Sequence, residues 1–275
     1  MNNKKDAVKV LSLAAGVLFV SVFVIVKLLP KGVALIFAEY GFPISSENLV
    51  IKYSMGIGIR AIGFILFFMI MKKAHMTELY HYKLDKNDLK LSWMFILYII
   101  LNIEIVPIEN LNLLPVLLMI TESLMIGLYE ETIFRGLVLQ IFLKKWGNSK
   151  QQIIFSVLTS SIMFGLIHLL NLSLNQNTAT VITQVCYATI MGIAFSALLL
   201  RTNGNLILCS FLHGFYDMAS GFGDFAEKAS SGTQAVSMPE NIFPYILNVI
   251  NFIPLLVYGL FLLRKAEPAS KRVKL

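Results

Sequence analysis

Eight apolar runs, most of them close to the length that crosses a lipid bilayer as a helix, constrain the fold more than any other feature of this sequence. They cover roughly residues 8–29, 50–71, 92–108, 116–144, 152–171, 179–200, 204–220 and 242–263. Backbone groups in lipid must form their hydrogen bonds within the protein, and no run shows the period-2 alternation of barrel strands. We therefore predict an all-α, polytopic membrane protein with eight transmembrane helices in one bundle, and a single integral membrane domain over residues 1–275.

The composition excludes an ordinary soluble domain, because 57% of the residues are hydrophobic and only 14% are charged, against about a quarter charged in soluble proteins. The formal net charge of +7 comes from Lys and Arg between the apolar runs, so it indicates membrane topology and no nucleic-acid partner. Cys186 and Cys209 lie within apolar runs, where a disulfide framework of the secreted kind is not expected.

The connections between the runs differ in their content of Lys and Arg, which are in excess on the cytoplasmic side of membrane proteins. One alternate set of ends contains Lys4, Lys5, Lys9, Lys72, Lys73, Lys83, Lys86, Lys90, Lys144, Lys145, Lys150, Arg201, Arg264, Lys265, Lys271, Arg272 and Lys274. The other set contains only Lys31, Lys52 and Lys228. An even number of crossings with both termini cytoplasmic fits this asymmetry, and the composition favours a bacterial cell membrane.

The fourth apolar run contains the densest group of charges, in the sequence YEETIFRG. Glu131 and Arg135 are four residues apart, so they share a helix face and are expected to pair. Glu130 lies about 100° around the helix and remains free of that pair. An ion pair that fixes helix register is the structural alternative, but it leaves Glu130 unexplained, because a further charge inside the membrane is costly.

Two later runs carry the remaining ionisable residues of interest. His168 lies in the fifth run, and His213 and Asp217 lie four residues apart on one face of the seventh. A lone intramembrane histidine often only forms a hydrogen bond between helices. Three separate helices that each supply a carboxylate or an imidazole favour a functional site, and residues from about 116 to 220 form the motif-bearing core.

Two chemistries suit two histidines and several carboxylates. Such ligands can hold zinc with one open position, or a carboxylate can activate water while histidines position it and stabilise the oxyanion. The sequence contains no H-E-x-x-H motif and no Ser or Cys in a recognised nucleophile motif. The residues alone leave both chemistries open, although the strongest sequence support for zinc is missing.

The ordered set E130-E131-x-x-x-R135, F164-x-x-x-H168 and H213-x-x-x-D217 resembles the CAAX protease and bacteriocin-processing family. That family joins the Ras-converting CAAX endopeptidases to the bacterial Abi proteins. The resemblance covers Glu130 to Asp217 and implies a metal-independent glutamate intramembrane protease with an eight-helix core, whose partner is a peptide or membrane-protein substrate.

The resemblance also implies a role for each matching residue. Glu130 would be the general base, His168 would help to hold the attacking water, and Glu131 with Arg135 would organise the helix. His213 and Asp217 would stabilise the oxyanion. The CAAX endopeptidases carry Asn at the position of Asp217, which argues against prenylated substrates; an ionised Asp only accepts hydrogen bonds, so it would fix the His213 tautomer or remain protonated.

Two other functions remain open at this point. One is a noncatalytic bacteriocin-immunity or scaffold protein that uses the same bundle for binding. The other is a proton- or ion-coupled transporter, because buried Glu and His also form relays, although no pair of broken helices in repeated halves is evident. Glu104 and Glu122 are further carboxylates in the spans, and Arg60 could balance one of them. The sequence contains no indication of oligomeric state.

Overall fold

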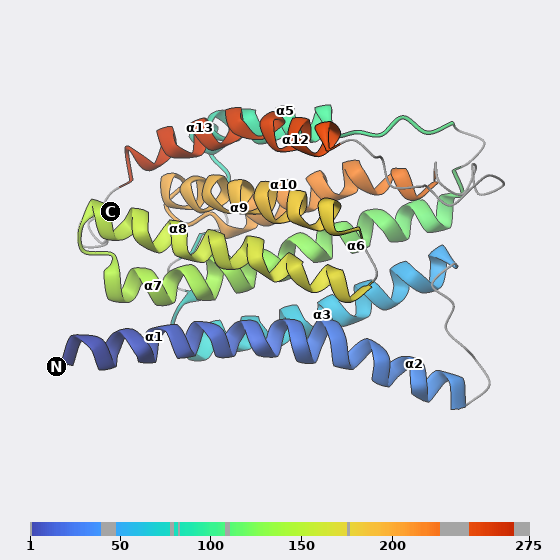
Figure 1. Ribbon diagram of the computed structural model, residues 1–275, viewed down its shortest axis with the longest axis horizontal. Coiled ribbons are helices and arrows are strands. Elements are labelled where there is room, and N and C mark those ends of the chain that lie inside the picture. The colour runs from blue at the N-terminus through green and yellow to red at the C-terminus, as the bar shows by residue number, and fades with distance from the viewer. Residues whose placement is uncertain are drawn as a thin grey trace. The chain divides into compact units, whose positions relative to one another are not determined.

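The computed structural model describes residues 2–39, 48–77, 80–81, 83–107, 111–174, 177–225 and 242–266. Within these ranges all regular secondary structure is helical (Figure 1), which confirms the predicted all-α class. The basic C-terminal residues Lys271, Arg272 and Lys274, which contributed to the predicted orientation, lie outside the described residues.

Six helical segments of the described chain are long and apolar enough to cross a membrane. They are Lys9–Ile36, Leu49–Lys73, Leu113–Trp146, Lys150–Leu172, Thr178–Arg201 and Phe243–Leu263. Each coincides with one of the eight predicted runs, so an integral membrane protein is supported, while the count of eight crossings is not confirmed.

The other two predicted runs form shorter helices. The first, α5 (Trp93–Leu101), has nine residues and is about 14 Å long, roughly half of the hydrocarbon thickness. It ends where the apolar run is interrupted by Asn102 and Glu104. The second, α10 (Leu206–Gly221), has 16 residues and follows Asn203 and Gly204, whose positive φ angles of 52° and 98° form a tight turn.

The chain divides into two compact units, each built from three separate stretches of sequence. Unit 1 comprises Met1–Glu78, Ile96–Leu137 and Leu206–Thr233. Unit 2 comprises Leu79–Phe95, Val138–Asn205 and Gln234–Leu275. The single integral membrane domain over 1–275 therefore stays a prediction, and the two units are described separately.

Unit 1 is organised around a central helix. Its elements are α1 (Asn2–Phe19), η1 (Val20–Leu28), α2 (Leu29–Glu39), α3 (Leu49–Lys73), α6 (Leu113–Glu131), most of η4 (Thr132–Val138) and α10. Figure 1 draws α1, η1 and α2 as one continuous rod (blue), and α6 packs against both α3 and α10.

The packing of α6 against α10 depends on two glycines. A Cβ on Gly127 would lie 2.2 Å from the carbonyl oxygen of Ser210 and 2.6 Å from the nitrogen of Gly214. A Cβ on Gly214 would in turn lie 2.8 Å from Leu124 Cα. Small residues let helices in membranes approach closely, so the backbones of α6 and α10 touch at this level.

The helix that carries α6 does not end at Glu131. It continues through η4, a π-helical segment, into α7 (Leu139–Trp146), which gives one helix of 34 residues. The apolar run predicted at 116–144 lies within this helix. A π-helical turn often marks a functional site, and Arg135 lies in it.

Unit 2 contains α4 (Lys86–Leu91), α7, α8 (Lys150–Ile167), η5 (His168–Leu174), α9 (Thr178–Arg201), α12 (Phe243–Asn251) and α13 (Ile253–Leu263). Its helices also meet at glycines. A Cβ on Gly192 of α9 would lie 2.8 Å from Ser161 Cβ of α8, and one on Gly259 of α13 would lie 3.0 Å from Ala194 Cα of α9. Within the described residues neither Cys186 of unit 2 nor Cys209 of unit 1 forms a disulfide.

Side-chain caps determine where several helices begin. Asn48, Asn112, Ser149 and Asn177 precede α3, α6, α8 and α9, and each accepts a hydrogen bond from a backbone N–H of the first turn. These are the residue types that satisfy the unpaired N–H groups of a helix start.

Candidate active site

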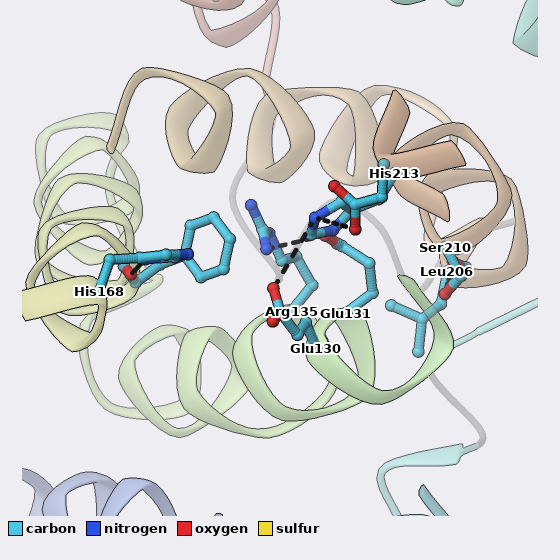
Figure 2. Close-up of polar contacts among 9 residues, drawn as sticks. Glu130, Glu131, Arg135, His168, Leu206, Ser210 and His213 are labelled. Atoms are coloured by element: carbon cyan, nitrogen blue, oxygen red, sulfur yellow. Dashed lines mark hydrogen bonds and ion pairs between the residues drawn. The ribbon is translucent and has the colours of Figure 1, made fainter. Parts of the chain in front are cut away.

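Glu131 and Arg135 form the predicted ion pair at the end of α6. The Glu131 Oε1 and Arg135 Nη1 atoms are 2.8 Å apart, and both side chains are almost completely buried (Figure 2). A buried pair of this kind is strongly destabilised when only one partner is removed. The pair therefore fixes the helix that carries Glu130.

The same carboxylate also holds a histidine from another helix. His213 of α10 has its Nδ1 atom 2.8 Å from Glu131 Oε1, and its side chain is 6% exposed (Figure 2). An ionised carboxylate only accepts hydrogen bonds. Nδ1 therefore carries the hydrogen, and Nδ1–H donates a hydrogen bond to Glu131. Glu131 thus orients the imidazole and selects its tautomer.

The opposite ring nitrogen of His213 faces two further carboxylates. Its Nε2 atom lies 3.6 Å from Asp217 Oδ2 and 3.7 Å from Glu130 Oε2. The side chains of Glu130 and Asp217 are each 27% exposed, whereas Glu131 is 0% exposed. Five predicted site residues therefore lie together in unit 1, with the accessible carboxylates on one side of the imidazole and the buried one on the other.

The glycine contact between α6 and α10 explains this registry. Gly127 precedes Glu131 by one helical turn, and Gly214 directly follows His213. Because the two backbones touch at these glycines, the side chains next to them are held at hydrogen-bonding distance. A bulkier residue at either glycine would separate the carboxylate from the imidazole.

Tyr129 fixes the same stretch of α6 from a third direction. Its hydroxyl donates to the carbonyl oxygen of Ser21 in η1 at 2.8 Å, and its ring lies 6.2 Å from that of Phe67 in α3. Gly63 makes room for the ring, since a Cβ there would lie 2.3 Å from Tyr129 Cε2. The residue directly before Glu130 is thus anchored to two other helices of unit 1.

His168 belongs to unit 2, at the start of η5. Its Nδ1 atom is 2.9 Å from the carbonyl oxygen of Phe164, and the two rings are 5.2 Å apart in an edge-to-face arrangement. A carbonyl oxygen accepts, so Nδ1–H donates and Nε2 is the acceptor nitrogen of the neutral ring. The predicted cooperation of His168 with Glu130 stays a prediction.

The arrangement in unit 1 has the components of acid–base chemistry. Glu130 is an accessible carboxylate, and His213 is an oriented imidazole beside it, so one can accept a proton while the other donates a hydrogen bond. No group of three or more His, Cys, Asp or Glu side chains in the described ranges is arranged to hold a metal ion.

Reasoning from sequence missed the contact between Glu131 and His213. Spacing along one helix predicts the pairing of Glu131 with Arg135, but it contains no information on which helices are neighbours. Gly127 and Gly214 were a usable signal, because small residues within apolar runs mark helix contacts. Arg60 does balance one of the two other span carboxylates, since its Nη1 atom lies 3.0 Å from Glu122 Oε1.

Comparison with known protein families matches residues 112–219 to the family described as type II CAAX prenyl endopeptidase Rce1-like. The matched segment contains all six predicted site residues, and the match confirms the family resemblance predicted from the ordered motifs. Comparisons with curated proteins and with solved structures found no match.

Proposed function

We propose that this chain, whose residues 112–219 match a CAAX protease family, is an intramembrane endopeptidase that hydrolyses peptide bonds with a glutamate-activated water. The observation that carries the proposal is the position of His213, held by Glu131 at 2.8 Å with its other nitrogen toward Glu130 and Asp217. An oriented imidazole beside an accessible carboxylate, inside apolar helices, suits hydrolysis better than a purely structural ion pair.

In the proposed reaction Glu130 is the general base. Its carboxylate takes one proton from a water molecule, and the water oxygen attacks the carbonyl carbon of the scissile peptide bond. The resulting tetrahedral intermediate collapses when the C–N bond breaks, and the proton held by Glu130 passes to the leaving amine. A positioned base of this kind typically contributes about 10²–10⁴ to the rate.

His213 would stabilise the oxyanion that forms during the attack. With Nδ1–H donated to Glu131, a second proton on Nε2 allows that nitrogen to donate to the oxyanion. Three carboxylates lie within 3.7 Å of the ring, so a proton on Nε2 has negatively charged neighbours. Asp217 then acts as an electrostatic partner of His213, since an ionised Asp cannot itself donate.

His168 is proposed to help hold the attacking water. The role is assigned from the F164-x-x-x-H168 motif. The hydrogen bond from Nδ1–H to the Phe164 carbonyl oxygen supports it, because Nε2 is then the acceptor nitrogen that can bind a water hydrogen. Arg135 is a positioning residue in this account, because it acts through Glu131.

The proposed topology keeps eight crossings in one membrane domain. Six have full span length, and α5 with its following residues and α10 would supply the two shorter ones. The Lys and Arg distribution supports cytoplasmic termini, and a bacterial cell membrane is the proposed location. The proposed partners are a peptide or membrane-protein substrate and lipid, with no metal or other cofactor.

The test is cleavage of a peptide library by the purified protein in detergent. We would compare the wild type, Glu130→Gln, and Glu104→Gln as a matched control for the loss of one carboxylate in unit 1, each with and without a strong chelator. Cleavage by the wild type and Glu104→Gln that survives the chelator but is lost in Glu130→Gln supports the proposal.

Two outcomes would overturn it. Sensitivity to the chelator would assign the chemistry to a metal held by the His and Glu side chains. If folded wild-type protein cleaves nothing and Glu130→Gln keeps the cellular phenotype, a noncatalytic immunity or scaffold function is the better account.

A further inference from the structure

Two basic residues in the N-terminal half of α3 each pair with a carboxylate of unit 1. Arg60 Nη1 lies 3.0 Å from Glu122 Oε1 of α6. Lys52 forms an ion pair with Asp224, a residue just beyond α10, and the hydroxyl of Tyr53 donates to the same carboxylate at 2.7 Å. Neither pair belongs to the candidate active site.

The acidic partners lie on or next to the two helices that carry the candidate site, Glu122 on α6 and Asp224 just beyond α10. Glu122 precedes Glu130 by eight residues of α6, which is about 12 Å along the helix. Asp224 follows Asp217 by seven residues and lies three residues past Gly221, the last residue of α10. Lys52 and Arg60 are also eight residues apart on α3. The two ion pairs therefore form a line of charged residues along unit 1 toward the site.

The charged side chains along this line are partly exposed although they lie within apolar helices. Arg60 is 28% exposed and Glu122 is 13% exposed, and Arg60 lies near the middle of the 25-residue helix α3. A charged group at that depth is costly in contact with lipid and almost always faces the bundle interior or water. We therefore expect the exposed parts of these side chains to contact water and not lipid.

The Arg60–Glu122 pair is held against the backbone of α3. Arg60 Nη1 also donates to the carbonyl oxygen of Gly56 at 3.3 Å. Gly56 leaves room for the Glu122 carboxylate, because a Cβ there would lie 1.8 Å from Glu122 Oε1.

We propose that this line of charged residues is a hydrated path that delivers water to Glu130. It begins beside the Lys52–Asp224 ion pair and passes the Arg60–Glu122 pair. The inference rests on the proposed function, because hydrolysis consumes one water for each peptide bond and the surrounding hydrocarbon excludes water. Water and small hydrophilic ions should enter this path but should not reach the lipid-facing side of α3.

The experiment measures the access of Ag⁺ to thiols in membranes that contain the full chain. The background carries Cys186→Ala and Cys209→Ala. One variant adds Arg60→Cys with Glu122→Gln, so that no unpaired charge remains. The matched control adds Ile62→Cys, at a position on the same helix that is 53% exposed and apolar. After Ag⁺ treatment the membranes are dissolved in SDS, and the remaining thiols are counted with a fluorescent maleimide.

We expect Ag⁺ to block the thiol of Arg60→Cys at least tenfold faster than that of Ile62→Cys. Equal rates for the two folded variants would overturn the path. Should Arg60→Cys fail to accumulate, Glu122→Cys with Arg60→Met replaces it, with the same expected ratio. The access of Ag⁺ to a thiol does not depend on catalysis, so the two proposals can fail separately. If the path is inaccessible but the enzyme is active, only this inference is refuted. If the path is accessible but the wild type is inactive, only the proposed function is refuted.

Discussion

Replacing Gly127 by Ala should uncouple the two helices that carry the candidate site. The added Cβ would lie 2.2 Å from the Ser210 carbonyl oxygen and 2.6 Å from the Gly214 nitrogen. Both contacts are with backbone atoms, so no side-chain rotation relieves them. Ordinary van der Waals contact begins at 3.4 Å, which requires α6 and α10 to separate by about 1.2 Å.

That displacement should reduce the cleavage rate strongly and the free energy of unfolding moderately. The bond between Glu131 Oε1 and His213 Nδ1, now 2.8 Å, would stretch to about 4 Å and be lost. A misplacement of about 1 Å can cost about 10² in rate, and overpacking typically costs about 1–3 kcal/mol in free energy of unfolding. We therefore expect Gly127→Ala to fold and to lose at least about 10² in cleavage rate.

The assay compares cleavage rate and thermal unfolding for Gly127→Ala and Gly58→Ala in one detergent. Gly58→Ala is the matched control, because a Cβ there meets nothing within 4 Å and Ala favours a helix more than Gly. The reasoning is refuted if folded Gly127→Ala keeps activity within about threefold of the wild type, or if Gly58→Ala loses as much.

Three substitutions test the stability of unit 1 through denaturant titration in detergent. Arg135→Met should lower the free energy of unfolding by about 3–5 kcal/mol, because the buried Glu131 loses its guanidinium partner. Adding Glu131→Leu should restore part of the loss, and an unchanged single variant would contradict this. Arg60→Met should cost only about 1 kcal/mol, since its pair with Glu122 is partly exposed; a loss equal to that of Arg135→Met would contradict the ranking. Tyr129→Phe should cost about 1 kcal/mol for its hydrogen bond to η1, and a stabilised variant would show that the anchor is unimportant.

The parts of the fold that depend on local sequence could be predicted. Apolar runs of span length indicate helices because lipid leaves the backbone no other partners, and the spacing of Glu131 and Arg135 predicts their ion pair. The run at 92–108 was expected to be a full span, but its helix ends at Leu101. Asn102 and Glu104, followed by Pro107, break the apolar pattern, and proline disfavours a helical residue before it.

The central contact of the site could not be predicted, because it depends on which helices are neighbours. Glu131 and His213 are 82 residues apart, and only the close approach of α6 and α10 brings them together. The sequence contained the cause, since Gly127 and Gly214 allow that approach, but it did not indicate that these two glycines face each other.

The central claim is that Glu130 activates the water that hydrolyses the peptide bond. The most direct measurement is the single-turnover cleavage rate of Glu130→Gln relative to the wild type and to Glu104→Gln, on one peptide selected from the library, with all three proteins shown to unfold at similar temperatures. We predict a loss of about 10²–10⁴ for Glu130→Gln, the contribution of a positioned general base, and a rate close to that of the wild type for Glu104→Gln. A folded Glu130→Gln protein that cleaves at the wild-type rate would contradict the account.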